Sequence, residues 1–181
     1  MTMKKITFIL TLACILLASC SNEHKFTLKG EIENLPSDTI LVYYQSPYNA
    51  IDTIIAEKGK FKYSIPADTF TIFSLLFNNN KDIPIYAYRD GKAKVSGPIS
   101  NITIEGEDDN LKMNEIFEME KKMKKDTLGI EKWIESFSKK NPDSYTNIYL
   151  LNRYFIQRVN PDYNKIKSIL ANLHGKVKDV P

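Results

Sequence analysis

The apolar residues of this chain change their spacing once, and that change limits the folds open to it. From Phe26 to about Gly106 they alternate with polar residues or form short β-branched and aromatic runs, which is typical of strands. From Leu111 onward they recur at helical spacing. The sequence therefore predicts an α+β fold, with an antiparallel β-sandwich or partly open barrel of seven to eight short strands followed by a small α-helical region.

Short stretches of turn-forming residues separate the predicted strands. The strands are 26–32, 39–44, 50–56, 61–65, 69–77, 83–88, 93–97 and 101–105. The run at 69–77 is long and apolar, which indicates a central strand, whereas Pro84 indicates an edge strand or a strand start. Asp90-Gly91 predicts a two-residue hairpin turn with a positive φ at Gly91.

Three to four helices are predicted after residue 106. A break at Thr127-Leu128-Gly129 separates the first two, and Asn141-Pro142-Asp143 and Asn160-Pro161-Asp162 each predict a helix start with Asn as N-cap. Trp133 falls on the apolar stripe of the second helix. We expect the segment 141–173 to cover this stripe, and the β region to have a separate core.

The first twenty residues predict export and lipid attachment. An uncharged apolar run at 6–17 is shorter than the roughly 20 residues that span a bilayer, and it fits the core of a secretory signal. The run ends in Leu17-Ala18-Ser19-Cys20, which resembles the lipobox of bacterial lipoproteins. The resemblance implies a signal peptide at 1–19, a lipid on Cys20 and a lipidated tether at 20–25. The alternative is an ordinary secretory signal that contains a cysteine.

Composition argues against several kinds of chemistry. The signal carries two of the 25 basic residues and none of the 22 acidic ones, so the rest of the chain is nearly neutral and nothing favours a nucleic-acid partner. Cys14 leaves with the signal and Cys20 is used for the lipid, which leaves no thiol for disulfide exchange. His24 and His174 are the only histidines. We therefore expect no catalytic residue, cofactor or metal site.

Three groups of residues have a functional alternative to a structural role. The acidic residues at 105–109 have oxygen ligands for calcium but lack the spacing of a calcium loop, so helix capping is favoured. The lysines at 121–125 can contact anionic lipids, although nearby glutamates offset them. Several tyrosines form a tentative binding surface for a sugar or peptide, although strand alternation sends some of them into the core. They are Tyr43, Tyr44, Tyr48, Tyr86 and Tyr88.

Short motifs across the β region resemble a known family. They are Phe26-Thr-Leu-Lys-Gly-Glu-Ile, Ile51-Asp-Thr-Ile and Gly59-Lys-Phe-Lys-Tyr-Ser. This region resembles the β-rich domain of unknown function that precedes the thioredoxin fold in envelope lipoproteins of anaerobic Gram-negative bacteria, and 137–181 is similar to their helical linker. In that family the redox chemistry belongs to a C-x-x-C in the thioredoxin fold. The resemblance therefore carries no catalytic residue over to this chain.

The expected organisation is a signal peptide at 1–19, a tether at 20–25, a β-sandwich-like domain at 26–106 and a helical region at 107–181. We expect a non-catalytic envelope lipoprotein, equivalent to the N-terminal part of such an oxidoreductase. It is either a shortened product or a module that binds or positions a protein or glycan partner. The alternative is a stand-alone lipoprotein that binds a peptide or glycan. Both hypotheses attach the chain through Cys20 to a bacterial membrane, by expectation the outer membrane, facing the periplasm or the cell surface.

Overall fold

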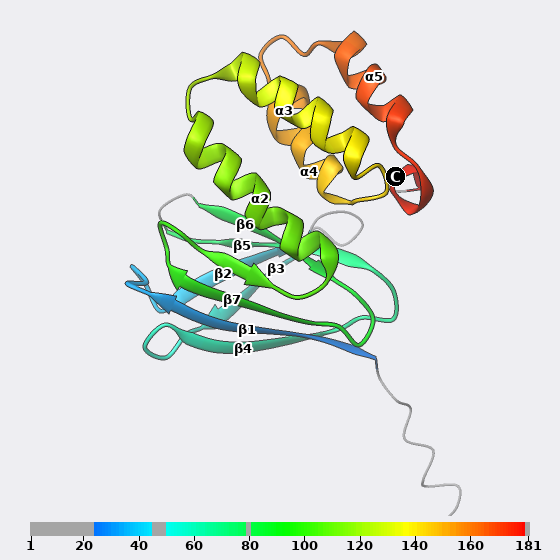
Figure 1. The fold of residues 1–181 in the computed structure, drawn as a ribbon. Helices are drawn as coiled ribbons and strands as arrows, with labels where there is room; N and C mark the ends of the chain where they lie inside the picture. The colour runs from blue at the N-terminus through cyan, green and yellow to red at the C-terminus, as the bar shows by residue number, and fades with distance from the viewer. Residues whose placement is uncertain (1–23, 45–49, 79–80, 180–181) are drawn as a thin grey trace, which may run out of the picture.

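The computed structural model describes residues 24–44, 50–78 and 81–179, which form two stacked β-sheets with helices packed on one side (Figure 1). The strands are β1 (Lys25–Glu33), β2 (Thr39–Tyr44), β3 (Ile51–Ile55), β4 (Lys60–Pro66), β5 (Thr71–Leu76), β6 (Asp82–Ala87), β7 (Lys92–Pro98) and β8 (Thr103–Glu105). Sheet A has the order β4-β1-β7-β8, and sheet B has the order β3-β2-β5-β6. The predicted α+β fold is confirmed, and the two separate sheets make it a sandwich. As predicted, β5 is central and β6 is an edge strand.

The inner faces of the two sheets form the core of the sandwich. Burial alternates along β1, where Phe26, Leu28, Gly30 and Ile32 point inward and their neighbours are exposed or half-buried. Phe26 of sheet A meets Phe73 of sheet B edge to face, with ring centroids 6.1 Å apart. Most neighbouring strands are antiparallel, and β1 and β7 are the parallel pair. Four strands of sheet B and one of sheet A separate β1 from β7 in sequence, which provides the long crossover that parallel pairing needs.

The turn at Asp90-Gly91 differs from the predicted hairpin. It joins β6 of sheet B to β7 of sheet A, so it passes between the sheets and does not connect paired strands. The positive φ belongs to Asp90, at 57°, and Gly91 is not among the positive-φ residues. The prediction of a positive φ at Gly91 is therefore wrong. Aspartate tolerates the left-handed region, so an Asp-Gly pair fits turns in which either residue adopts it.

Four helices and a short 3-10 turn follow the strands. They are α2 (Asp108–Met123), α3 (Thr127–Lys140), α4 (Thr146–Leu151) with its π-helical continuation η1 (Asn152–Ile156), α5 (Tyr163–Asn172) and η2 (Gly175–Asp179). A break does separate α2 from α3, but it lies at 124–126; the predicted break at 127–129 is wrong, because these residues form the first turn of α3. The Asp126 carboxylate caps that helix by accepting from the Gly129 N–H at 2.9 Å.

Both predicted asparagine N-caps are wrong. Asn141 is the C-cap of α3, and its side-chain amide donates to the Phe137 carbonyl at 3.1 Å. The cap of α5 is Asp162, which accepts from the Lys165 N–H at 3.0 Å. Asparagine and aspartate cap helices about equally well. In the second Asn-Pro-Asp motif the helix therefore begins after the aspartate, whereas after the first motif α4 begins only at Thr146.

The helices share the core of the sandwich. Met113, Ile116 and Met119 of α2 are at most 3 % exposed. The buried apolar residues form one continuous cluster from Phe26 in β1 to Val177 in η2. The expectation of a separate β core is therefore wrong. The apolar stripe of α2 was visible in the sequence, but its spacing did not show that the sandwich would cover it.

The stripe of α3 lies between α2 and the C-terminal segment, as Figure 1 shows. Trp133 stacks on Phe137, with ring centroids 4.9 Å apart, and borders a hollow of about 410 Å³ on α2 beside Met119 and Met123. On the other side of α3, the nearly buried carboxylate of Glu131 forms ion pairs at 2.5 Å with Arg158 and Lys165. The segment after residue 141 therefore covers only part of the stripe.

Candidate binding surface

Two asparagines of α2 form hydrogen bonds with the backbone of the edge strands on one side of the sandwich. Asn110 and Asn114 are one helical turn apart and share a face of the helix. Asn110 accepts from the Tyr86 N–H at 3.0 Å and donates to the Tyr86 carbonyl at 2.8 Å. Asn114 makes the same two bonds with Ile104, at 2.8 and 2.7 Å. Tyr86 lies in β6 and Ile104 in β8, so α2 satisfies the edge strands of both sheets.

Sequence reasoning missed this pair of asparagines and considered only the acidic residues at 105–109, as a helix cap or a calcium site. Asn110 is completely buried. A buried amide needs partners for its N–H and C=O groups. Two asparagines four residues apart, on the face of a helix that also carries Met113, are therefore a signal that the helix contacts backbone rather than only side chains.

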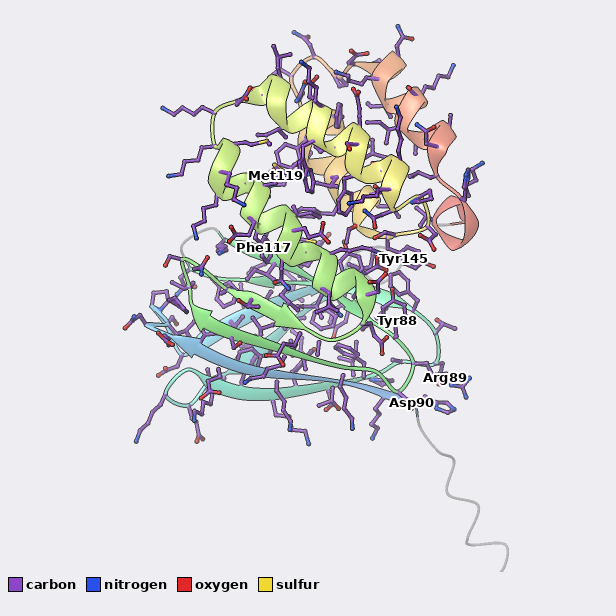
Figure 2. All side chains as sticks on the ribbon, in the orientation of Figure 1. Tyr88, Arg89, Asp90, Phe117, Met119 and Tyr145 are labelled. Carbon is purple, nitrogen blue, oxygen red and sulfur yellow. The ribbon has the colours of Figure 1, made fainter. Side chains whose placement is uncertain are left out.

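Asp109 joins the first turn of α2 to the helices that follow. Its buried carboxylate accepts hydrogen bonds from the hydroxyls of Tyr88 and Ser144. The Phe70 ring packs on both Tyr145 and Tyr88, with centroids 3.8 and 5.1 Å away, and Figure 2 shows the two tyrosines where sandwich and helices meet. Burial, followed by the hydrogen bond to Asp109, raises the pKa of Tyr88. These contacts give the junction a structural role.

The other acidic and basic runs have ordinary surroundings. Glu107 is the N-cap of α2 but makes no side-chain capping bond, while Asp108 and Asp109 occupy the first turn, where negative charge is favourable. At the other end of α2, Lys121 and Lys122 lie 3.8 and 3.9 Å from Glu118. Within the described ranges, no cluster of three or more metal-ligating side chains is found.

The tyrosines predicted as a binding surface lie in different environments. Tyr86 is completely buried, which corrects its assignment to a surface, because α2 covers the end of sheet B that carries it. Tyr88 is half-buried at the junction just described. Tyr43 and Tyr44 are half-buried neighbours in β2. Tyr48, like the lipidation residue Cys20, lies outside the described residues.

Tyr44 and Tyr63 connect the two sheets at the side opposite α2. The Tyr63 hydroxyl donates to Asp52 at 2.7 Å, so it accepts from the Tyr44 hydroxyl at 2.5 Å. Tyr44 and Asp52 belong to sheet B and Tyr63 belongs to β4 of sheet A. The hydrogen bond from Tyr63 lowers the pKa of Asp52, while burial raises the pKa of both tyrosines.

The outer face of sheet B remains uncovered beside Tyr43. Ile51 and Ile55 of β3 are 68 % and 65 % exposed, and Leu41 of β2 is 40 % exposed. Tyr43 is paired with Ile51, and Leu41 with Thr53, so these side chains share one face. We refer to Leu41, Tyr43, Ile51, Thr53 and Ile55 as the β2–β3 strip. The helices pack toward the β6 and β8 side (Figure 1), so none of the described helices covers the strip.

Comparison with curated proteins and with solved structures finds no match. None of the helices in the described part of the chain is long and apolar enough to cross a membrane. Residues 26–114 match the family model described as Domain of unknown function (DUF4369). The matched range runs through the strands into α2 and includes both Asn110 and Asn114. The β-rich part of this chain, with the first two turns of α2, is therefore similar to the domain of unknown function DUF4369.

Proposed function

We propose that this chain is a non-catalytic, lipid-anchored protein of the bacterial cell envelope whose sandwich binds or positions a protein partner. The observation that carries the proposal is the β2–β3 strip. Single exposed apolar residues are common on proteins, but apolar residues gathered in one patch mark interaction sites. Here Ile51 and Ile55 flank Thr53 on an edge strand, beside Leu41 of the neighbouring strand.

We also propose that the chain is equivalent to the N-terminal part of a thioredoxin-like disulfide oxidoreductase. The match of 26–114 to a β-rich domain of unknown function supports the resemblance found in the sequence. Residues 21–181 contain no cysteine, so this part of the chain lacks the thiolate that disulfide exchange requires. Its contribution in such an arrangement is to hold or place a partner.

A stand-alone lipoprotein that binds a peptide is the second candidate. The β2–β3 strip favours a peptide over a glycan because its most exposed side chains are aliphatic. Extended peptides pair with sheet edges through backbone hydrogen bonds and place alternate side chains against the sheet.

Cys20→Ala is expected to abolish membrane attachment, because only the thiol accepts the diacylglycerol. Each buried methylene of an acyl chain contributes about 0.8 kcal/mol, so several chains give a stable anchor. Detergent phase partitioning of cell extracts measures the effect. Cys14→Ala, inside the predicted signal, is the matched control and should partition as the unchanged chain does. Membrane partitioning of the Cys20→Ala protein would contradict the lipid anchor.

A photo-reactive residue in place of Ile55 is expected to form covalent protein adducts when the full chain is illuminated in intact cells. Ile55 is exposed, so its replacement leaves the core intact. The same residue in place of Lys62, which is exposed in β4 of the other sheet, is the control and should give no comparable adduct. If Ile55 gives no more adduct than Lys62 at equal expression, the β2–β3 strip is not a binding surface.

A further inference from the structure

The four edge strands of the two sheets are protected to different degrees. Natural sheets block edge-to-edge pairing with lysines, prolines, short strands or covering groups. The backbones of β6 and β8 are bonded by Asn110 and Asn114, β6 also contains Pro84, and β8 has three residues. β4 carries exposed lysines at Lys60 and Lys62. β3, with the sequence Ile-Asp-Thr-Ile-Ile, is protected least: among the described residues it has no lysine, proline or covering helix, and Asp52 bonds only the Thr53 N–H of its edge.

The hydrogen bonds of β3 show which of its backbone groups face outward. Tyr44 donates to the Ala50 carbonyl at 2.9 Å, and Ala56 donates to the Asp38 carbonyl at 2.7 Å. Bonded pairs alternate along an antiparallel ladder, so the even-numbered residues of β3 face β2. The N–H and C=O groups of Ile51, Thr53 and Ile55 therefore point to the free edge. None of the three has a backbone partner within the described residues.

We propose that β3 pairs antiparallel with β3 of a second copy of this chain, about a two-fold axis at Thr53. This inference rests on the proposed function, because it names the partner of the β2–β3 strip. A two-fold axis requires the same surface on both copies. The free edge of β3 meets this condition because Ile51, Thr53 and Ile55, whose backbone groups face outward, have the same order Ile-Thr-Ile in both directions. Ile51 lies opposite Ile55 of the second copy, and Thr53 lies opposite its own counterpart.

In this register no like charges lie directly opposite one another, and Ile51 lies opposite Ile55 of the second copy. Like charges directly opposite one another destabilise strand pairs. Asp52 is the only charged residue of β3, and in this register it lies opposite Ile54 of the second copy. In the single chain the Asp52 carboxylate accepts from the Thr53 N–H at 2.7 Å. Pairing replaces this bond with one to the Thr53 carbonyl of the second copy, while Asp52 keeps its bond from Tyr63.

The surface area that two paired β3 strands bury determines how strongly the two copies bind each other. Two five-residue strands bury less than the roughly 1,200 Å² of total surface that stable complexes need. The pair is therefore weak between free chains in dilute solution. Attachment of both copies to one membrane makes the encounter effectively intramolecular and raises the local concentration. The lipid anchor then raises the local concentration of the chain, and the β3 edges form the contact.

Cysteine cross-linking of the full chain in intact cells tests the register. With Cys14 removed and Cys20 acylated, an introduced cysteine is the only free thiol. Directly opposite, hydrogen-bonded residues have Cα atoms about 5.5 Å apart, which is within disulfide range. Under mild oxidation, Thr53→Cys is expected to give a disulfide-linked dimer as its main product. Ile51→Cys or Ile55→Cys alone should not, but the two variants expressed together should.

Two controls separate the proposed pairing from chance collision. Lys62→Cys, exposed on β4, measures the background. Ile55→Lys added to Thr53→Cys should abolish the dimer without lowering the melting temperature, because Ile55 is exposed. Asp52→Ala should raise the yield by freeing the Thr53 N–H. A Thr53→Cys yield no higher than that of Lys62→Cys would overturn the inference, as would equal cross-linking of Ile51→Cys alone.

The photo-cross-linking result distinguishes this inference from the proposed function. Adducts of twice the chain's mass from Ile55, together with the Thr53→Cys dimer, support both. Adducts that contain a different protein, without the Thr53→Cys dimer, overturn the self-pairing and leave the proposed function standing. If Ile55 gives no adduct and Thr53→Cys gives no dimer, both fail.

Discussion

A chain that ends at Gly106 is expected to remain unfolded under conditions in which residues 21–181 fold cooperatively. The shorter chain loses α2 and with it both amide pairs that satisfy β6 and β8. Removing α2 also exposes the apolar surface of the sandwich that Met113, Ile116 and Met119 cover. Burial of each of these side chains contributes about 1.5–3 kcal/mol. These losses reach the roughly 5–15 kcal/mol that stabilises a typical domain.

Circular dichroism melts of the two chains measure this difference. The full chain should show one cooperative transition, and the shorter chain should show none. A cooperative, β-type melt of the chain that ends at Gly106 would mean that the sandwich has a sufficient core of its own. The boundary at 106 expected from the sequence would then be a true domain boundary.

Gly59→Val is expected to destabilise the protein by between about 2 and about 6 kcal/mol. Gly59 has φ 77° in the turn from β3 to β4, a conformation that a β-branched residue adopts only with strain. A Cβ atom there would lie 2.1 Å from the Ile32 carbonyl oxygen, which is backbone of β1 and cannot rotate away. The variant therefore combines backbone strain with a steric clash.

Urea unfolding measures the loss, with Lys58→Gly as the matched control. Lys58 is the neighbouring turn residue and also has a positive φ, of 52°. Glycine relieves the cost of that conformation, so Lys58→Gly should not destabilise the protein. A Gly59→Val protein with the midpoint of the unchanged chain would show that this turn relaxes without cost.

The strands were predictable because their signal is local. Each strand is half-buried, so polar and apolar residues alternate along it, as in β1. The information that assigns each strand to one of the two sheets is not local in the sequence. The turn at Asp90-Gly91 has the composition of a hairpin, yet it leads from one sheet to the other. Which strand a segment pairs with depends on residues far away in sequence, and a turn motif does not contain that information.

The candidate surface was only partly predictable for a related reason. Alternation predicted that some of the five tyrosines would be buried, but not that the outer face of sheet B would be covered at β6 and exposed at β3. That difference depends on where α2 lies, and Asn110 and Asn114 fix its position through backbone contacts. Tyr86 is therefore not part of the exposed surface, whereas Ile51 and Ile55, which the sequence does not single out as surface residues, are part of it.

The unequal protection of the sheet edges is the central claim, and amide hydrogen exchange of the full chain in dilute solution tests it most directly. Edge amides bonded by a buried side chain exchange only when the structure opens, whereas free edge amides exchange readily. The amides of Tyr86 and Ile104, held by Asn110 and Asn114, are predicted to exchange slowly. Those of Ile51 and Ile55 are predicted to exchange fast. Equal rates at the two sides of the sandwich, or faster exchange at Tyr86 and Ile104, would contradict the account.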